Sequence, residues 1–228
     1  MKKALYFLSL GLLLATTTQA QDKPVSVYIT QFNVTPADLE SGLKDSDATF
    51  RFDAKIKTII AQDTSVQLAA FDPEAPVSEK WVILAKDGEA PTKKEFKTFY
   101  KYHNTKKDGV NAKVLADSWA IESEDENSLV VSFQYETSSL PKKYHFLEDT
   151  KGLAYINKSA NRLTHVIFKN DTPLQVKQYK TNSYELYVKY YYDTQDKVYL
   201  IEWEDLTMET SNGKIKELSE FNDYRKEK

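Results

Sequence analysis

The stretch Leu129-Val130-Val131-Ser132-Phe133-Gln134-Tyr135 carries the pattern that decides the fold. Its odd positions are all apolar or aromatic, whereas Ser132 and Gln134 between them are polar, so an extended chain here has one face suited to burial. The same alternation recurs from Tyr184 to Tyr192 and from Phe50 to Ile56. A period of two residues predicts β-strands with one buried side, and therefore a mainly β protein.

Six shorter runs rich in β-branched and aromatic residues predict further strands. Turn-forming pairs such as Asp87-Gly88 and Asn212-Gly213 separate such runs, and their spacing favours an antiparallel meander. The six runs are Ser65 to Phe71, Lys80 to Ala85, Leu153 to Asn157, Leu163 to Phe168, Leu174 to Tyr179 and Val198 to Met208.

Helices are indicated by local signals. Thr92-Lys93-Lys94-Glu95 is a capping box, in which the threonine hydroxyl and the glutamate carboxylate each satisfy a backbone amide at the helix start. Apolar residues follow it at helical spacing, which predicts a helix over about 92–103. Thr35-Pro36 predicts a second helix running to Leu43, and a weaker pattern suggests a third over Asp108 to Asp117.

These elements predict a mainly β (α+β) fold: a curved antiparallel sheet or half-barrel with one or two helices packed on its concave face. The helix over 92–103 is expected to pack through Phe96, Phe99 and Tyr100. Because the chain has no internal repeat, low-complexity tract or flexible linker, residues 21–228 are expected to form a single β-rich domain.

Residues 1–20 have the features of a secretory signal peptide. Lys2 and Lys3 precede an apolar run of about a dozen residues, and Thr18 and Ala20 put small residues at the positions that a signal peptidase reads. Cleavage is expected near Ala20. The apolar run is shorter than the roughly 20 residues of a membrane span. We therefore expect a soluble periplasmic or secreted bacterial protein with no transmembrane segment in its mature chain.

The composition argues against several classes of function. The chain has no cysteine, which excludes disulfides, thiolate metal sites and an acylated lipoprotein anchor. Its net charge is −3, and its only arginines are Arg51, Arg162 and Arg225, so a nucleic acid partner is not expected. No metal-ligand spacing and no glycine-rich phosphate loop occurs, and we predict neither a metal nor another cofactor.

Catalytic candidates are sparse. His103, His145 and His165 are scattered, and Ser-x-x-Lys at Ser41, Ser139 and Ser211 lacks the other signatures of a serine hydrolase. Acidic residues at 122 and 124–126 lack the spacing of a calcium loop and indicate a solvated connection. No catalytic residue is predicted. An envelope hydrolase acting through carboxylates brought together by folding, or through His103, stays open as an alternative.

One segment resembles a known pattern. Phe71-Asp72-Pro73, Trp81-Val82-Ile83-Leu84, Asp87-Gly88 and Pro91-Thr92 together look like strand, turn, strand, turn and capped helix in uncharacterised exported proteobacterial proteins. Those proteins resemble the outer-membrane lipoprotein carrier (LolA/LolB-like) fold. The resemblance implies an incomplete antiparallel barrel wrapped over helices around an apolar cavity, and a lipid-like or lipoprotein ligand.

Tyrosine is abundant in the predicted strands, and two interpretations of these aromatic residues stay open. They either pack a filled core, as in a protein-interaction or scaffold module, or line a surface that binds an apolar or amphiphilic ligand without catalysis. We predict the second, with the oligomeric state left open. The candidate ligand-binding residues are Trp81, Phe96, Phe99, Tyr100, Phe133, Tyr135 and Tyr190.

Overall fold

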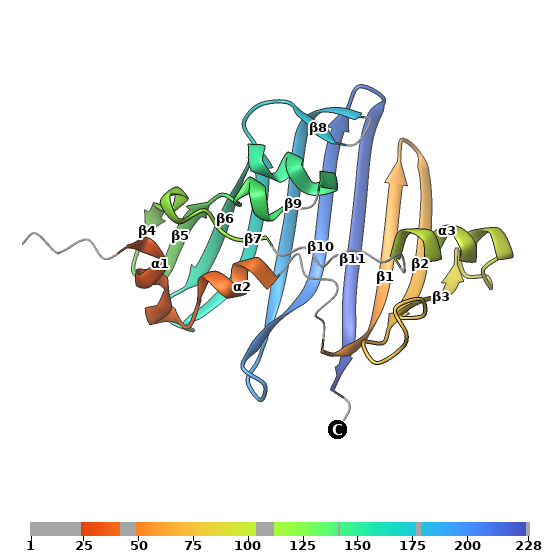
Figure 1. Cartoon of the computed structure of the whole chain (residues 1–228), viewed down its shortest axis with the longest axis horizontal. Helices are drawn as coiled ribbons and strands as arrows, with labels where there is room; N and C mark the ends of the chain where they lie inside the picture. Colours follow the sequence, from red (N-terminus) through yellow and green to blue (C-terminus); the bar gives the residue numbers. More distant parts are fainter. Residues whose placement is uncertain (1–23, 42–48, 104–111, 141, 177–178, 227–228) are drawn as a thin grey trace, which may run out of the picture.

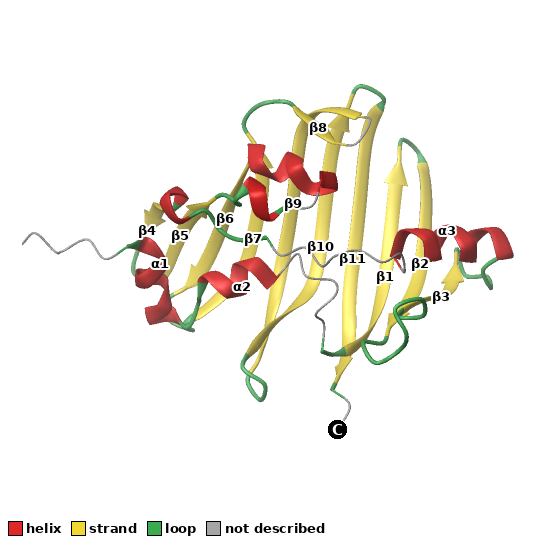
Figure 2. Ribbon diagram, viewed as in Figure 1, coloured by secondary structure: helices red, strands yellow, loops and turns green. Residues whose placement is uncertain are grey.

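A computed structural model describes residues 24–41, 49–103, 112–140, 142–176 and 179–226. The segment expected to be a signal peptide, residues 1–20, lies outside the described residues. Figure 1 and Figure 2 show a mainly β chain in which one broad curved sheet carries its helices on a single face. This architecture confirms the fold class expected from the alternating sequence.

The sheet has 11 strands, and every neighbouring pair is antiparallel. The strands are β1 Arg51–Ile60, β2 Asp63–Phe71, β3 Trp81–Lys86, β4 Ala120–Glu124, β5 Ser128–Phe133, β6 Thr150–Asn157, β7 Arg162–Asn170, β8 Leu174–Val176, β9 Tyr179–Asp193, β10 Val198–Thr210 and β11 Gly213–Arg225. The helices are α1 Val25–Tyr28, α2 Pro36–Ser41 and α3 Lys93–His103, with 3₁₀ segments at Ile29–Phe32, Ala116–Ser118, Thr137–Ser139 and Lys142–Asp149.

The strand order brings the first and last strands, β1 and β11, together at the middle of the sheet. From one side to the other the order is β3-β2-β1-β11-β10-β9-β7-β6-β5-β4, and β8 pairs with one end of β9. The chain therefore runs outward from β1 to the edge strand β3, crosses to the other edge at β4, and returns strand by strand to β11. Pairing of β11 with β1, for example Ala54 opposite Phe221, joins the two halves. The sheet stays open because β3 and β4 do not meet.

The main core lies between the helix-bearing face of β5 to β10 and the segments α1, α2 and Lys142–Asp149 (Figure 1). Its buried side chains are the apolar positions of the alternating strands, as period-two patterning requires, together with apolar residues of the helical segments that cover them. They include Ile29, Leu39, Leu129, Val131, Phe133, Tyr135, Leu147, Ile156, Val166, Tyr184, Val188 and Tyr190. Burial of these residues fills the space between the helices and this part of the sheet.

Two small clusters occupy the other end of the sheet. Phe52, Ala54 and Phe71 pack together on β1 and β2, while Ala69 and Ile83 pack against Phe99 of α3. Trp81 contacts both clusters. The helix α3 is therefore held on β2 and β3 by a few side chains, well apart from α1 and α2 (Figure 1).

The opposite face of the sheet bears a ladder of four stacked rings. Tyr155, His165, Tyr187 and Trp203 lie on β6, β7, β9 and β10, with successive ring centroids 4.1, 4.8 and 4.9 Å apart and interplanar angles of 15°, 17° and 26°. Tyr187 points away from the main core because its neighbours Leu186 and Val188 point into it. The ladder ties four strands together on the face that no described helix covers.

The strand and helix predictions are mostly confirmed. Each predicted strand overlaps an observed one, and α2 and α3 match the two firmer helix predictions, although residues 42–43 lie outside the described part of the chain. Strands β4 and β11 were not predicted. Of the described residues of the third predicted helix, Asp108 to Asp117, the last two lie in the 3₁₀ segment Ala116–Ser118, but the prediction is wrong for 112–115: Val114 bridges Tyr135, and the Leu115 amide donates to the carbonyl of Gln134 at 2.8 Å. Pairing with an extended partner leaves no room for a helix there.

Candidate ligand groove

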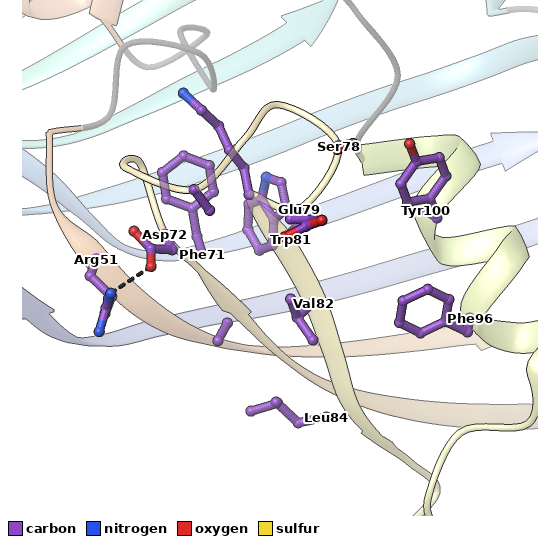
Figure 3. Close-up of a pocket in the computed structure, with 13 residues that line it drawn as sticks. Arg51, Phe71, Asp72, Ser78, Glu79, Trp81, Val82, Leu84, Phe96 and Tyr100 are labelled. Carbon is purple, nitrogen blue, oxygen red and sulfur yellow. Dashed lines mark hydrogen bonds and ion pairs between the residues drawn. The ribbon is translucent and has the colours of Figure 1, made fainter.

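A hollow lies around the edge strand β3, and Figure 3 shows its lining. We call it the groove. It has a volume of 770 Å³ and is bounded by β2, β3, the loop that connects them, and α3. The side chains that line it are Arg51, Ala70, Phe71, Asp72, Ala75, Ser78, Glu79, Lys80, Trp81, Val82, Leu84, Phe96 and Tyr100. Residues from both faces of β3 contribute, so the groove follows the edge of the sheet.

Trp81 is fixed at the centre of this site by other aromatic rings. Its ring centroid lies 5.4 Å from that of Phe52, 5.1 Å from Phe71 and 6.5 Å from Phe99. It also lies 5.3 Å from the ring of His103, which itself stacks on Phe99 at 4.2 Å. Edge and tilted contacts of this kind are favourable for aromatic rings. Trp81 is thus a pre-positioned wall of the groove.

The groove is strongly apolar at its exposed surface. Val82 and Leu84 on β3 are 38% and 54% exposed, and Phe96 and Tyr100 on α3 are 47% and 38% exposed. Large apolar side chains that share a hollow and remain open to solvent mark a surface able to bind an apolar partner. Burying them on a ligand would be favourable by roughly 25 cal/mol for each Å² of apolar surface covered.

Arg51 and Asp72 form a polar pair on the groove wall (Figure 3). The guanidinium Nη2 donates to Asp72 Oδ2 at 2.5 Å, and the Glu74 amide donates to Oδ1 at 3.0 Å. Partial desolvation acts to raise the pKa of Asp72, but the hydrogen bonds from the Glu74 amide and Arg51 outweigh it and hold this pKa below its usual value. The pair therefore presents fixed opposite charges beside the apolar wall.

The start of α3 fixes the helix against β3, and the capping box read from the sequence is formed. The Thr92 amide and hydroxyl donate to Glu95 Oε2 at 2.9 and 2.7 Å, and the Glu95 amide donates to Thr92 Oγ1 at 3.3 Å. Lys86 at the end of β3 donates to Glu95 Oε1 at 2.9 Å. Hydrogen bonds from Thr92 and Lys86 lower the pKa of Glu95 to about 2. This network orients the face of α3 that borders the groove.

The packing of α3 differs from the expectation. Phe99 is buried at 5% exposure, as expected, whereas Phe96 and Tyr100 are largely open, so the prediction that all three would pack on the sheet is wrong for those two. The reason is the position of α3 over the edge strand: residues on its outer flank extend past β3, where no further strand covers them.

The seven candidate site residues fall in two separate places. Trp81, Phe96 and Tyr100 line the groove, and Phe99 lies behind Trp81. Phe133, Tyr135 and Tyr190 lie in the main core at 0%, 3% and 7% exposure.

Tyr135 and its neighbours are held in the core by local contacts. The Tyr135 hydroxyl donates to the carbonyl of Leu39 at 2.8 Å, and burial raises the pKa of Tyr135 well above its ordinary value. The ring of Tyr135 stacks on Phe168 at 5.7 Å. Because these side chains are buried and their contacts are with other core residues, they leave no open surface for a ligand.

Sequence reasoning did not select Val82, Leu84, Arg51 or Asp72. The unbroken apolar run from Trp81 to Leu84 is a signal that both faces of this strand are apolar. What could not be read is that β3 lies at an edge of the sheet, since strand order depends on contacts far apart in the chain.

The residues weighed for catalysis or metal binding have structural contacts. His145 Nε2 lies 3.0 Å from the carbonyl of Leu140, and His165 sits inside the ring ladder. Glu122 and Glu124 pair with Lys151 and Lys158 at 2.6 and 2.8 Å, on or beside β4. Within the described ranges, no cluster of three His, Asp or Glu side chains is arranged to hold a metal ion.

None of the helices in the described part of the chain is long and apolar enough to cross a membrane. A search of known protein families, curated proteins and solved structures gave no match to this chain.

Proposed function

We propose that this protein binds an apolar or amphiphilic ligand, lipid-like in character, without catalysing a reaction. The observation that carries the proposal is the exposure of Val82, Leu84, Phe96 and Tyr100 around one 770 Å³ hollow. A soluble protein seldom leaves such side chains grouped and open to water without a partner.

The chemistry of the groove supports an amphiphile in particular. The apolar part of the ligand would cover Leu84, Phe96 and the Trp81 ring, while a polar head would lie near Arg51 and Asp72 at the opposite wall. A few polar groups beside a mostly apolar lining is the usual composition of a small-molecule site. We further propose that binding takes place outside the cytoplasm, because residues 1–20 have the pattern of a signal peptide.

The test uses a long-chain fatty acid brominated on its acyl chain, because bromine quenches tryptophan fluorescence only at short range. We expect saturable quenching of the wild-type protein that is lost in Trp81→Phe and retained in Trp203→Phe, since Trp203 lies in the ladder on β10. Native mass spectrometry of the same mixtures is expected to show one fatty acid per chain.

A matched pair of surface variants separates the groove from general hydrophobicity. Leu84 is 54% exposed within the groove and Ile60 is 53% exposed at the end of β1, so Leu84→Ser and Ile60→Ser remove similar exposed apolar surface. We expect Leu84→Ser to weaken fatty acid binding at least tenfold and Ile60→Ser to leave it unchanged. Equal loss in both variants, or no quenching of the wild type, would overturn the proposal.

A protein-interaction module is the second candidate, and two observations favour it. The space beneath α1 and α2 is filled by core side chains such as Phe133 and Leu39. In addition, β3 is an edge strand of the sheet. The Asp72 amide donates to the Lys80 carbonyl at 2.8 Å, so these two residues form a hydrogen-bonded pair. Because such pairs alternate along an antiparallel ladder, the amide and carbonyl of Ile83 point away from β2. A partner could add a strand there. A protein that takes up no fatty acid but binds an extended peptide through β3 would support this candidate.

A further inference from the structure

The outward face of α3 carries a row of lysines that the groove does not use. Lys93, Lys94, Lys97 and Lys101 are all exposed, and we call them the lysine row. With 3.6 residues per turn they fall within an arc of about 100°. Phe99, which is buried against Ala69 and Ile83, lies outside this arc toward the sheet. The row therefore faces solvent at one end of the molecule (Figure 1).

No acidic side chain within the described residues forms an ion pair with the lysine row. The single acidic residue of α3, Glu95, binds Thr92 and Lys86 on the side of β3. A shallow hollow of 530 Å³ runs along the row, lined by its four lysines with Thr98 and Tyr102. The positive charge of this face is thus not neutralised by the described residues and can attract an anionic partner, although the whole chain carries a net charge of −3.

Exposed aromatic rings border the lysine row on both sides. Tyr102 is 60% exposed on one flank, and Phe96 and Tyr100 are 47% and 38% exposed on the other. Lysines surrounded by aromatic side chains on one helix are the composition of interfacial helices, in which cations meet lipid headgroups and rings enter the boundary below them. Nucleic acid recognition fits less well, because α3 has no arginine for bidentate contacts.

We propose that α3 docks this protein on the surface of an anionic lipid bilayer. The lysine row contacts the headgroups, while Tyr102, Phe96 and Tyr100 lie at the level of the interface. Charge complementarity favours a bilayer as the partner, since a row of four lysines that form no ion pair with an acidic side chain of the described residues suits a surface of negative headgroups. Docking goes beyond ligand binding in the groove, because it depends on the lysine row, which does not line the groove. Because Phe96 and Tyr100 belong to both surfaces, docking also brings the groove to the bilayer.

The experiment measures binding of the purified protein to vesicles by co-sedimentation. Vesicles of phosphatidylethanolamine and phosphatidylglycerol are compared with vesicles of phosphatidylcholine alone, at low and high salt. We expect binding to the anionic vesicles only, and its loss at high salt through screening. Binding of similar strength to both kinds of vesicle, or no binding at low salt, would overturn the proposal.

A charge-matched pair of variants locates the contact. Lys93→Gln/Lys94→Gln/Lys97→Gln removes three charges from the row, whereas Lys169→Gln/Lys180→Gln/Lys214→Gln removes three from exposed strand positions. We expect the first variant to partition roughly a hundredfold more weakly and the second to stay within about threefold of the wild type. Glutamine keeps the helix propensity of lysine, and losing cations near a helix N-terminus does not weaken the helix. Equal losses in the two variants would show that only overall charge matters.

Two further measurements separate membrane docking from ligand binding in the groove and from binding of a soluble polyanion. Leu84→Ser is expected to bind vesicles as the wild type does but to lose fatty acid binding. The Lys93/Lys94/Lys97 variant is expected to bind fatty acid as the wild type does but to lose vesicle binding. The two proposals can therefore fail independently of each other. Heparin serves as a soluble polyanion. Binding to heparin through the lysine row without binding to anionic vesicles would assign the row to another partner and overturn membrane docking.

Discussion

Phe133 on β5 lays its ring so closely over Gly152 on β6 that a Cβ at position 152 would come within 2.5 Å of the ring's Cζ atom. The two residues lie directly opposite each other in the sheet, and Phe133 is fully buried among Trp119, Tyr135 and Phe168. Glycine is needed at 152 because the ring occupies the space of a side chain. The pair fixes how the main core packs on β6.

Gly152→Ala is expected to destabilise the fold by about 1–3 kcal/mol, because the buried ring has no space into which it can move. Urea unfolding followed by circular dichroism measures the change. Phe133→Leu removes the ring atoms that a Cβ would meet, so the double variant is expected to lose less stability than the two single losses added together. Additive losses would contradict the proposed clash.

Tyr135→Phe tests whether this tyrosine is part of the core or of a ligand site. The change leaves the buried carbonyl of Leu39 without its hydroxyl donor, and we expect a loss of about 1–3 kcal/mol of stability. Fatty acid binding is expected to stay unchanged, because Tyr135 does not line the groove. Tyr100→Phe is the control, since its exposed hydroxyl is expected to contribute little to stability.

How far the fold could be predicted from the sequence is clear from particular elements. Alternation in Leu129 to Tyr135 revealed the buried face of β5, and Thr92 with Glu95 located the start of α3, because both signals are local. The pairing of β1 with β11 depends on residues such as Ala54 and Phe221, which lie far apart in the chain. No local pattern encodes that pairing.

The candidate site was predictable only in part, for a related reason. Aromatic residues on a strand look alike whether they face a helix or water, so Tyr135 and Tyr190 could not be separated from Trp81 by their type. The core and groove residues differ in whether another segment packs over them. Helix α2 packs over Tyr135, whereas no described strand or helix covers Leu84 on the edge strand β3. Edge position follows from strand order and was not accessible to sequence reasoning.

Acid is expected to weaken the anchoring of α3 through Glu95. The pKa of this carboxyl is lowered to about 2 in the folded protein, against an ordinary value of 4.5. The folded state therefore favours the charged form, and its contribution is complete above pH 4.5 and is lost as the pH falls toward 2. Glu95→Ala should reduce stability at pH 7 and flatten the pH dependence between 4.5 and 2. Glu126→Ala, at an exposed position, is the control; an equally flat profile there would contradict the assignment.

His165 is expected to make the fold less stable as the pH falls below about 6.5. Burial in the ladder between Tyr155 and Tyr187 lowers the pKa of His165, and Lys189 lies opposite it on β9. The unfolded chain then binds a proton more readily than the folded one, so stability rises with pH from the lowered value up to 6.5. His165→Phe keeps a stacking ring and removes the charge. Its unfolding free energy should lose this part of the pH dependence, and an unchanged slope between pH 5 and 7 would refute the prediction.

Hydrogen exchange should reveal that the end of the sheet bearing the groove opens more easily than the rest. There, β3 has a strand on one side only, and α3 is attached mainly through Phe99, whereas β6 lies between two strands beneath a continuous core. Elements with few buried contacts open at lower free energy. Amides of β3 and α3 are therefore expected to exchange at least tenfold faster than those of β6. Leu163→Ala, a core change on β7, should speed exchange in β6 while leaving the ranking intact. Equal protection at the two ends would mean that the small clusters around Trp81 hold the edge as firmly as the main core holds β6, and the groove would then be a rigid surface.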